Sequence, residues 1–120
     1  FFILCGPNEK EIENEIISKL DKKNYIALSE KGIEDLIPFL CASDMYVGND
    51  SFGSHITSQS GKKSIVMLLD SPKAYTDYSK NYHRMVPNGF NIEKITHGIN
   101  ADPNLITVED VIKTINYFRN

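Results

Sequence analysis

The chain has 120 residues, of which 41% are hydrophobic and 24% charged, an ordinary balance for a globular protein and enough for one compact domain. Its net charge is −3 and its lysines are scattered among acidic residues, so we expect no nucleic-acid partner. No apolar run is long enough to span a bilayer, and two cysteines are too few for a disulfide framework. We therefore expect a cytoplasmic protein with buried, reduced thiols.

Residues 1–5 open the chain as a continuous apolar run without an initiator Met. Such a run predicts a strand buried on both faces. Because this strand is already under way at the first residue, we expect residues 1–120 to be a single domain excised from a larger chain that continues on the N-terminal side. Asn8 then predicts the N-cap of a helix, and Glu11 the third helical position of a capping box.

Short strands and helices alternate along the middle of the chain. Residues 25–28 and 45–47 predict strands, and the apolar spacing within residues 33–41 predicts a helix between them. Pro38 fits this helix only if the helix begins shortly before it.

Beyond the third strand, small polar residues at 50–60 predict a helix that ends at Gly61, and residues 64–69 predict a fourth strand. Residues 70–104 show a weak pattern that is typical of loops and short elements. A final helix is predicted by the capping pair Thr107 and Asp110 and by the apolar spacing after it.

Strands that alternate with helices at this pitch predict an α/β protein. We expect a Rossmann-like fold with a mostly parallel sheet and helices on both faces. Ligands of such sheets bind beyond the carboxyl ends of the strands. The segment that follows the third strand is therefore the first candidate for a binding site.

That segment carries polar groups suited to an anion: Asp50, Ser51, Phe52, Gly53, Ser54 and His55. A helix begins here, and its unpaired amides and positive dipole end attract phosphate groups. Gly53 allows close backbone approach, the two serines add hydroxyl donors, and His55 adds a ring N–H. The alternative is structural: Asp50 or Ser51 caps the helix and His55 is a packed polar residue.

The run of residues 42–51, followed by His55 and by residues 60–66, resembles glycosyltransferase family 9, the ADP-heptose:lipopolysaccharide heptosyltransferases and their relatives. The resemblance begins at residues 5–11, extends to about Leu69 and is weaker in the final helix. It implies the C-terminal half of a GT-B fold, which has two Rossmann-like domains. The C-terminal domain of such enzymes binds the nucleotide-sugar donor.

The family motif is Asp, then Ser or Thr, then Gly, with His five positions after the Asp. Asp50, Ser51 and His55 match it, but Phe52 stands at the glycine position and Gly53 follows one place later. The resemblance implies that the amides of residues 51–54 hold the diphosphate and that Asp50 reaches sugar hydroxyls or braces the loop. We expect Phe52 to face the interdomain cleft rather than to pack beneath the loop.

The resemblance also implies an acidic residue near Glu9 to Glu11 that bonds the ribose hydroxyls. A carboxylate suits this role because it accepts from a vicinal diol. The structural alternatives are dipole compensation by Glu9 and the capping box for Glu11. Three tyrosines either stack on a base or sugar or form part of the core: Tyr75, Tyr78 and Tyr82.

The function implied is binding of an ADP-heptose-like donor for inverting glycosyl transfer in lipopolysaccharide or other surface-glycan synthesis. The catalytic base and the glycan or glycolipid acceptor are expected in the N-terminal domain, with peripheral inner-membrane association of the full-length protein. This part of the chain then binds without catalysing. We expect no cofactor and no metal, since His83 and His97 stand in no metal-ligand spacing.

Two alternatives remain open on the sequence. One is a nucleotide-sugar epimerase of GT-B architecture, which shares a site at the same edge of the sheet. The other is a phospho-acceptor receiver domain, which fits the length and the acidic residue after the third strand. A receiver needs an acidic pair after the first strand, where this chain has Cys5 and Gly6.

Overall fold

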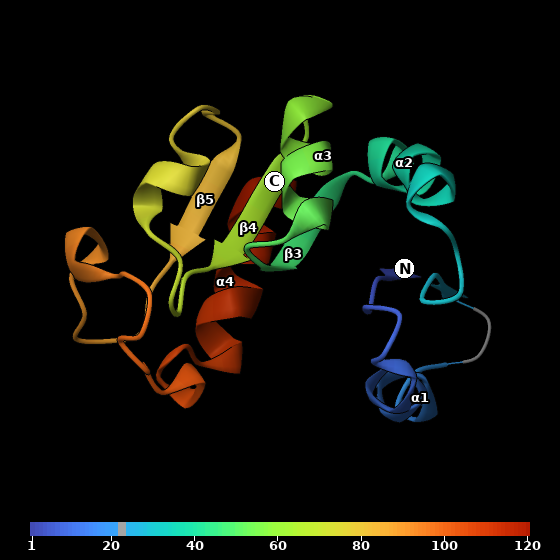
Figure 1. Cartoon of the computed structure of the whole chain (residues 1–120), viewed down its shortest axis with the longest axis horizontal. Coiled ribbons are helices and arrows are strands. Elements are labelled where there is room, and N and C mark those ends of the chain that lie inside the picture. Colours follow the sequence, from blue (N-terminus) through green and yellow to red (C-terminus); the bar gives the residue numbers. More distant parts are fainter. Residues whose placement is uncertain (22–23) are drawn as a thin grey trace. The chain divides into compact units, whose positions relative to one another are not determined.

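A computed structural model of the chain describes residues 1–21 and 24–120 (Figure 1). The chain divides into two compact units, residues 1–43 and 44–120. The first unit contains β1 (Phe2–Ile3), α1 (Lys10–Ser18), β2 (Ile26–Ala27) and α2 (Ile33–Ala42). β1 and β2 pair in parallel, Phe2 opposite Ile26. These elements match the predicted strand and helix segments, except that α2 ends one residue later and the two strands are shorter than expected.

The start of α1 differs from the prediction. Glu9, and not Asn8, occupies the N-cap position, and no side chain caps the helix. The Glu9 carboxylate instead folds back and accepts a hydrogen bond of 2.5 Å from the amide of Gly6. This longer side chain closes the turn before the helix, so the helix begins one residue later. The capping box predicted for Glu11 is also wrong, and Glu11 is exposed.

An acidic residue one turn further along α1 is fully buried. Glu13 accepts hydrogen bonds from the Ser29 amide at 3.0 Å and hydroxyl at 2.6 Å, and from the Lys10 ammonium at 2.8 Å. Burial alone raises the pKa of Glu13, but these hydrogen bonds outweigh it and lower the pKa to about 2. Glu13 therefore ties α1 to the segment after β2 as a carboxylate.

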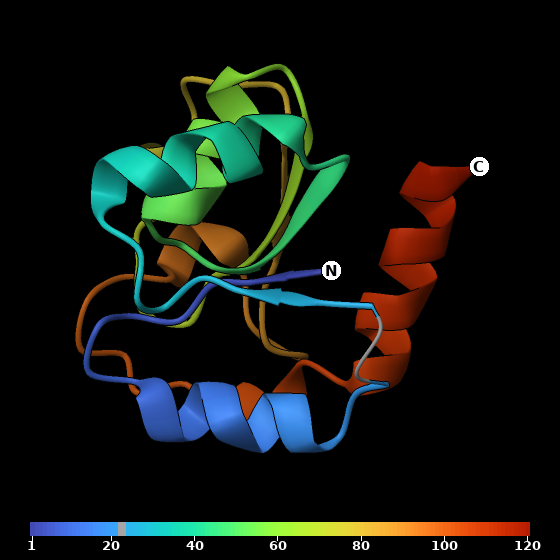
Figure 2. The same ribbon diagram turned by 90° about the vertical axis from the view of Figure 1, so that its right-hand side faces the viewer.

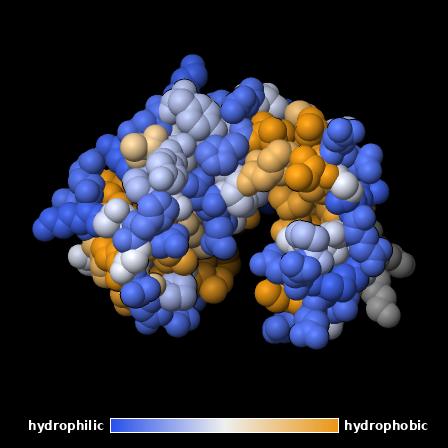
Figure 3. Space-filling view, viewed as in Figure 1, coloured by the Kyte–Doolittle hydropathy of each residue, from blue (hydrophilic) through white to orange (hydrophobic). Residues whose placement is uncertain are grey.

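The helix α2 contains a proline in its interior. Pro38 is the sixth of its ten residues, so the helix begins earlier than the proline rule suggests. Burial of Leu36 and Leu40 and the edge-to-face contact of Phe39 with Phe2, at 5.3 Å between ring centroids, compensate for the lost hydrogen bond. Hydrophobic surface gathers in the region of α2 (Figure 3), where Ile33 and Ile37 are exposed.

The second unit holds a three-stranded sheet and most of the short elements. In chain order they are β3 (Met45–Asn49), α3 (Phe52–Gln59), β4 (Lys63–Met67), the 3₁₀ turn η1 (Lys73–Thr76), β5 (Tyr82–Met85), the 3₁₀ turns η2 (Ile92–Lys94) and η3 (Pro103–Leu105), and α4 (Val108–Arg119). The strand order is β3-β4-β5 and all pairs are parallel. The strand β5 was not predicted.

Helices cover both faces of this sheet (Figures 1 and 2). On one face, α3 packs on β3 and β4, and the Ser64 hydroxyl donates to the Ser54 carbonyl at 2.9 Å. On the other face, Phe118 of α4 lies beneath the Lys63 ammonium, 4.5 Å from the ring centroid, and contacts the His83 ring. The predicted α/β, Rossmann-like class with a parallel sheet and helices on both faces is confirmed.

The end of α3 and the start of α4 follow the predictions from the sequence. Gly61 ends the segment after α3 with a φ of 86°, a left-handed conformation that favours glycine. Thr107 caps α4 by accepting from the Asp110 amide at 3.2 Å, as predicted. The core of the unit lies between β4, β5 and the loops after them, around Val66, Leu68 and Ile95.

We predict that Glu13 makes stability depend on acid. Its pKa is about 2 in the folded chain against 4.5 for the free group, so the stabilisation is complete above pH 4.5 and is lost as the pH falls toward 2. Glu13→Gln should lower the free energy of unfolding by about 1–3 kcal/mol at pH 7 and flatten its pH dependence below 4.5. Urea titrations from pH 2.5 to pH 7 would measure both.

The matched control is Glu11→Gln, the same change at an exposed position of the same helix. It should leave the unfolding curve within about 0.5 kcal/mol of wild type. Equal acid sensitivity of wild type and Glu13→Gln would contradict the role given to Glu13.

Candidate functional site

The candidate site forms where β3 ends and α3 begins. Ser51 is the N-cap of α3, a position that serine favours. Its amide donates to the Ser54 hydroxyl at 3.2 Å, and that hydroxyl donates back to the Ser51 carbonyl at 2.7 Å. Ser54 and Gly53 are buried, and the Ser64 hydroxyl of β4 holds the Ser54 carbonyl from below. The loop is thus fixed to the middle strand of the sheet.

These bonds change the role expected of Ser54. Its side chain is fully buried and both donates and accepts within the loop, so it supports the loop rather than presenting a hydroxyl outward. Its amide is also engaged, with the Ser51 carbonyl at 3.0 Å. Of the amides at residues 51–54, those of Phe52 and Gly53 are the ones that a helix leaves without an intrahelical partner.

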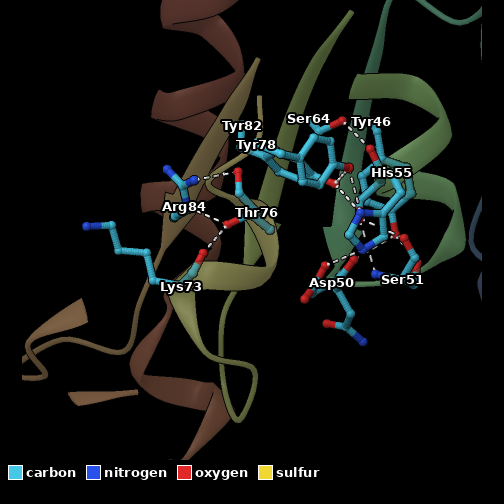
Figure 4. Close-up of polar contacts among 12 residues, drawn as sticks. Tyr46, Asp50, Ser51, His55, Ser64, Lys73, Thr76, Tyr78, Tyr82 and Arg84 are labelled. Carbon is cyan, nitrogen blue, oxygen red and sulfur yellow. Dashed lines mark hydrogen bonds and ion pairs between the residues drawn. The ribbon is translucent and has the colours of Figure 1, made fainter. Parts of the chain in front are cut away.

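A row of polar side chains crosses the sheet beneath α3. Tyr46 of β3, Ser64 of β4 and Tyr82 of β5 are register partners, so they lie side by side on one face. Ser64 in the middle is short and lets α3 approach. The two tyrosines are longer, and their hydroxyl groups reach Ser51 and His55 at the start of α3 (Figure 4).

Tyr46 supports the start of the loop. Its hydroxyl donates to the Asn49 carbonyl at 3.0 Å and lies 2.9 Å from the Ser51 hydroxyl. Burial raises the pKa of Tyr46, the Ser51 hydrogen bond lowers it by a smaller amount, and the nearby charge of Asp50 adds a small upward shift. Tyr46 therefore keeps its proton and acts as a hydrogen-bond donor. This residue was not predicted from the sequence.

His55 lies one turn into α3 and contacts three side chains (Figure 4). Its Nε2 is 3.1 Å from Oδ1 of Asp50, and its Nδ1 is 2.6 Å from the Tyr78 hydroxyl and 2.9 Å from that of Tyr82. The Tyr78 ring stacks on the imidazole with an interplanar angle of 19°. A carboxylate can only accept, so the proton of a neutral His55 belongs on Nε2 and Nδ1 accepts.

Asp50 is the most constrained group of the site. Only 6% of its side chain is exposed, and Oδ1 has no hydrogen bond among the described residues. The Nε2 atom of His55 is close enough for an ion pair but does not meet hydrogen-bond geometry, so the two observations describe one close, misaligned contact. A buried polar atom in this state is rare and calls for an explanation, such as a partner that re-aligns on binding.

The remaining predicted residues are less closely tied to this cluster. Phe52, the first residue of α3, has 39% of its surface exposed. Glu9 and Glu11 belong to the first unit. Of the tyrosines that were left open, Tyr82 is 6% exposed and belongs to the core, whereas Tyr78 and Tyr75 are exposed.

Residues 1–21 and 24–120 contain no cluster of three or more His, Cys, Asp or Glu side chains placed to hold a metal ion. In the same residues no helix is long and apolar enough to cross a membrane. Both cysteines are free thiols, but Cys41 is exposed and Cys5 is only partly buried, so the expectation that both are buried is wrong.

Comparison with known proteins gives one distant likeness. The chain is 24% identical over 111 residues to lipopolysaccharide heptosyltransferase 1 of Campylobacter coli, an alignment that covers 89% of the chain. The chain spans about a third of the length of this relative, 32%. No family model matches the sequence. No solved structure matches it either.

We predict that His55 is a structural partner as well as a site residue. His55→Ala removes the imidazole that lies 3.1 Å from the buried Asp50 oxygen and leaves the Tyr82 hydroxyl without its nitrogen partner. The free energy of unfolding should fall by about 1–3 kcal/mol. Denaturant titration would measure it, with His97→Ala as the control, because His97 is exposed and contacts only Tyr75, at 3.2 Å, among the described residues. Equal losses for the two variants would contradict this prediction.

Proposed function

We propose that this chain binds the nucleotide-sugar donor of a glycosyltransferase, at the N-terminus of α3. The observation that carries the proposal is the buried, poorly paired Asp50 carboxylate beside His55 at a helix start on the carboxyl edge of a parallel sheet. Helix N-termini at such edges are natural diphosphate sites. The distant likeness to a heptosyltransferase supports a glycosyltransferase-like role in particular.

Each residue of the loop has a part in this proposal. The amides of Phe52 and Gly53 point to the phosphate oxygens, and the exposed Ser51 adds a hydroxyl group. Because the Nε2–H of His55 is misaligned with Asp50, a phosphate oxygen can compete for it. Asp50 is buried toward His55, so we propose that it orients the imidazole before the ligand binds and does not reach the sugar hydroxyls.

For the whole protein we propose inverting glycosyl transfer from an ADP-sugar, such as an ADP-heptose, onto a lipopolysaccharide or other surface glycan. The developing negative charge on the diphosphate leaving group would be stabilised by the helix start and His55. The catalytic base and the acceptor site would lie in another domain, and the protein would work in the cytoplasm, at or near the inner membrane. Its free thiols fit a reducing compartment.

We predict that the chain binds a nucleoside diphosphate sugar weakly. Complete pockets bury most of the surface of their ligand, whereas half of a two-domain cleft buries only part of it. We therefore expect dissociation constants of about 0.1–1 mM. Calorimetry with ADP-, UDP-, GDP- and CDP-sugars would test the proposal and rank the bases. A folded sample that binds none of them at millimolar concentration would overturn it.

We predict that Phe52 contributes to ligand binding and contributes little to the stability of the fold. It is partly exposed at the first helical position, so Phe52→Gly should cost less than about 1 kcal/mol of stability. Removal of an aromatic ring from the rim should weaken nucleotide binding severalfold. Phe52→Tyr keeps the ring and should bind as wild type does. A loss of several kcal/mol in Phe52→Gly would place the ring in the core instead.

A further inference from the structure

Two tyrosine hydroxyl groups meet at a single ring nitrogen. The hydroxyls of Tyr78 and Tyr82 lie 2.6 Å and 2.9 Å from Nδ1 of His55, and 3.0 Å from each other. With Nε2 facing the Asp50 carboxylate, Nδ1 offers one lone pair. One lone pair accepts one proton well, so the two hydroxyls cannot both be satisfied by the imidazole.

Burial decides which tyrosine donates to His55. Tyr82 is 6% exposed, so its hydroxyl must find its acceptor inside. Among the described residues, the hydroxyl of Tyr82 is hydrogen-bonded to Nδ1 of His55 and to the Tyr78 hydroxyl. The imidazole nitrogen is the stronger acceptor of the two, and although the Tyr78 hydroxyl lies closer to it, only Tyr78 is exposed enough to find an acceptor elsewhere. Tyr82 therefore donates to Nδ1. Burial and the neighbouring Tyr78 hydroxyl raise the pKa of Tyr82, so this proton stays on its oxygen.

The hydroxyl proton of Tyr78 is then the surplus proton, because Nδ1 of His55 already accepts from Tyr82. Inside the cluster it finds only the phenolic oxygen of Tyr82, a weak neutral acceptor, at 3.0 Å. Tyr78 is 53% exposed, so its hydroxyl can also turn outward beside the start of α3. Its ring is meanwhile held in place by stacking on His55.

We propose that Tyr78 is a ligand-binding residue, whose hydroxyl donates to an anionic phosphate oxygen of the bound nucleotide while Tyr82 holds His55. A charged phosphate oxygen is a stronger acceptor than a phenol, so the hydrogen bond moves from Tyr82 to the ligand. No covalent bond changes in this step. The inference rests on the proposed function, because it names a further contact of the same diphosphate site.

The test is Tyr78→Phe, which keeps the stacked ring and removes the hydroxyl. Binding of ADP to the chain should weaken roughly tenfold or more, as expected for a hydrogen bond to a charged group. Binding of adenosine, which has no phosphate, should not change. Tyr75→Phe is the matched control: Tyr75 is as exposed as Tyr78, and its hydroxyl contacts His97 instead. If ADP does not bind, the nucleoside diphosphate that the wild type does bind replaces it, with its own nucleoside.

A double-mutant cycle with Tyr82→Phe tests the shared nitrogen. Without the Tyr82 hydroxyl, Tyr78 becomes the donor to Nδ1 and its proton is no longer surplus. Tyr78→Phe should then cost clearly less affinity in the Tyr82→Phe background than in the wild type. Equal costs in both backgrounds would overturn the assignment of protons.

The possible failures are distinct. A Tyr78→Phe variant that binds the diphosphate as tightly as the wild type overturns this inference and leaves the proposed function in place. A Tyr78→Phe variant that loses nucleoside and diphosphate equally overturns the phosphate contact. A folded wild type that binds no nucleoside diphosphate overturns both the function and the inference.

Discussion

The seating of α3 on the middle of the parallel sheet is the contact on which the site depends. Ser64 presents a short hydroxyl to the Ser54 carbonyl at 2.9 Å, so the first turn of the helix lies directly on β4. A larger side chain at either position would lift the helix, because both residues are fully buried. With the helix held there, its N-terminal amides stand at the carboxyl edge of the strands.

The same register explains why the polar groups converge. Tyr46 and Tyr82 flank Ser64 on the neighbouring strands and are long enough to reach Ser51 and His55. Tyr46 fixes the loop before α3 through Asn49 and Ser51, and Tyr82 fixes His55 within it. A short residue between two long ones thus creates space for a helix and two supports for it. Buried hydroxyls of this kind are stable only while each has a partner, which makes the cluster rigid.

Polar burial also organises the first unit, by different means. Glu13 is enclosed with three donors, from Lys10 and from the amide and hydroxyl of Ser29. A buried carboxylate is tolerated when its acceptor sites are filled, and here they are filled by charge-assisted bonds. Asp50 in the second unit is the contrasting case: a carboxylate with one oxygen buried and unbonded among the described residues. Of these two carboxylates, Asp50 is therefore the one whose hydrogen bonding a ligand would change.

Local sequence signals identified most of the elements and the position of the loop. The helix at 33–42, the Gly61 turn and the Thr107 cap follow from spacing, from left-handed glycine conformation and from side-chain capping, all of which act within a few residues. The N-cap predicted at Asn8 was wrong because Glu9 occupies that position, and its carboxylate accepts from the Gly6 amide. The strand β5 was missed because Tyr-His-Arg-Met has no alternating pattern, and pairing with β4 supplies its stability.

The sequence by itself determined the parallel α/β class and the polar segment from Asp50 to His55, because both depend on residue order along the chain. Only the tertiary structure decided which side chains surround that segment. Tyr46, Tyr78 and Tyr82 come from three places in the sequence and meet at Ser51 and His55 through strand register and the path of the loop after η1. The burial of Ser54 was likewise set by β4, ten residues away, through a contact that no local pattern encodes.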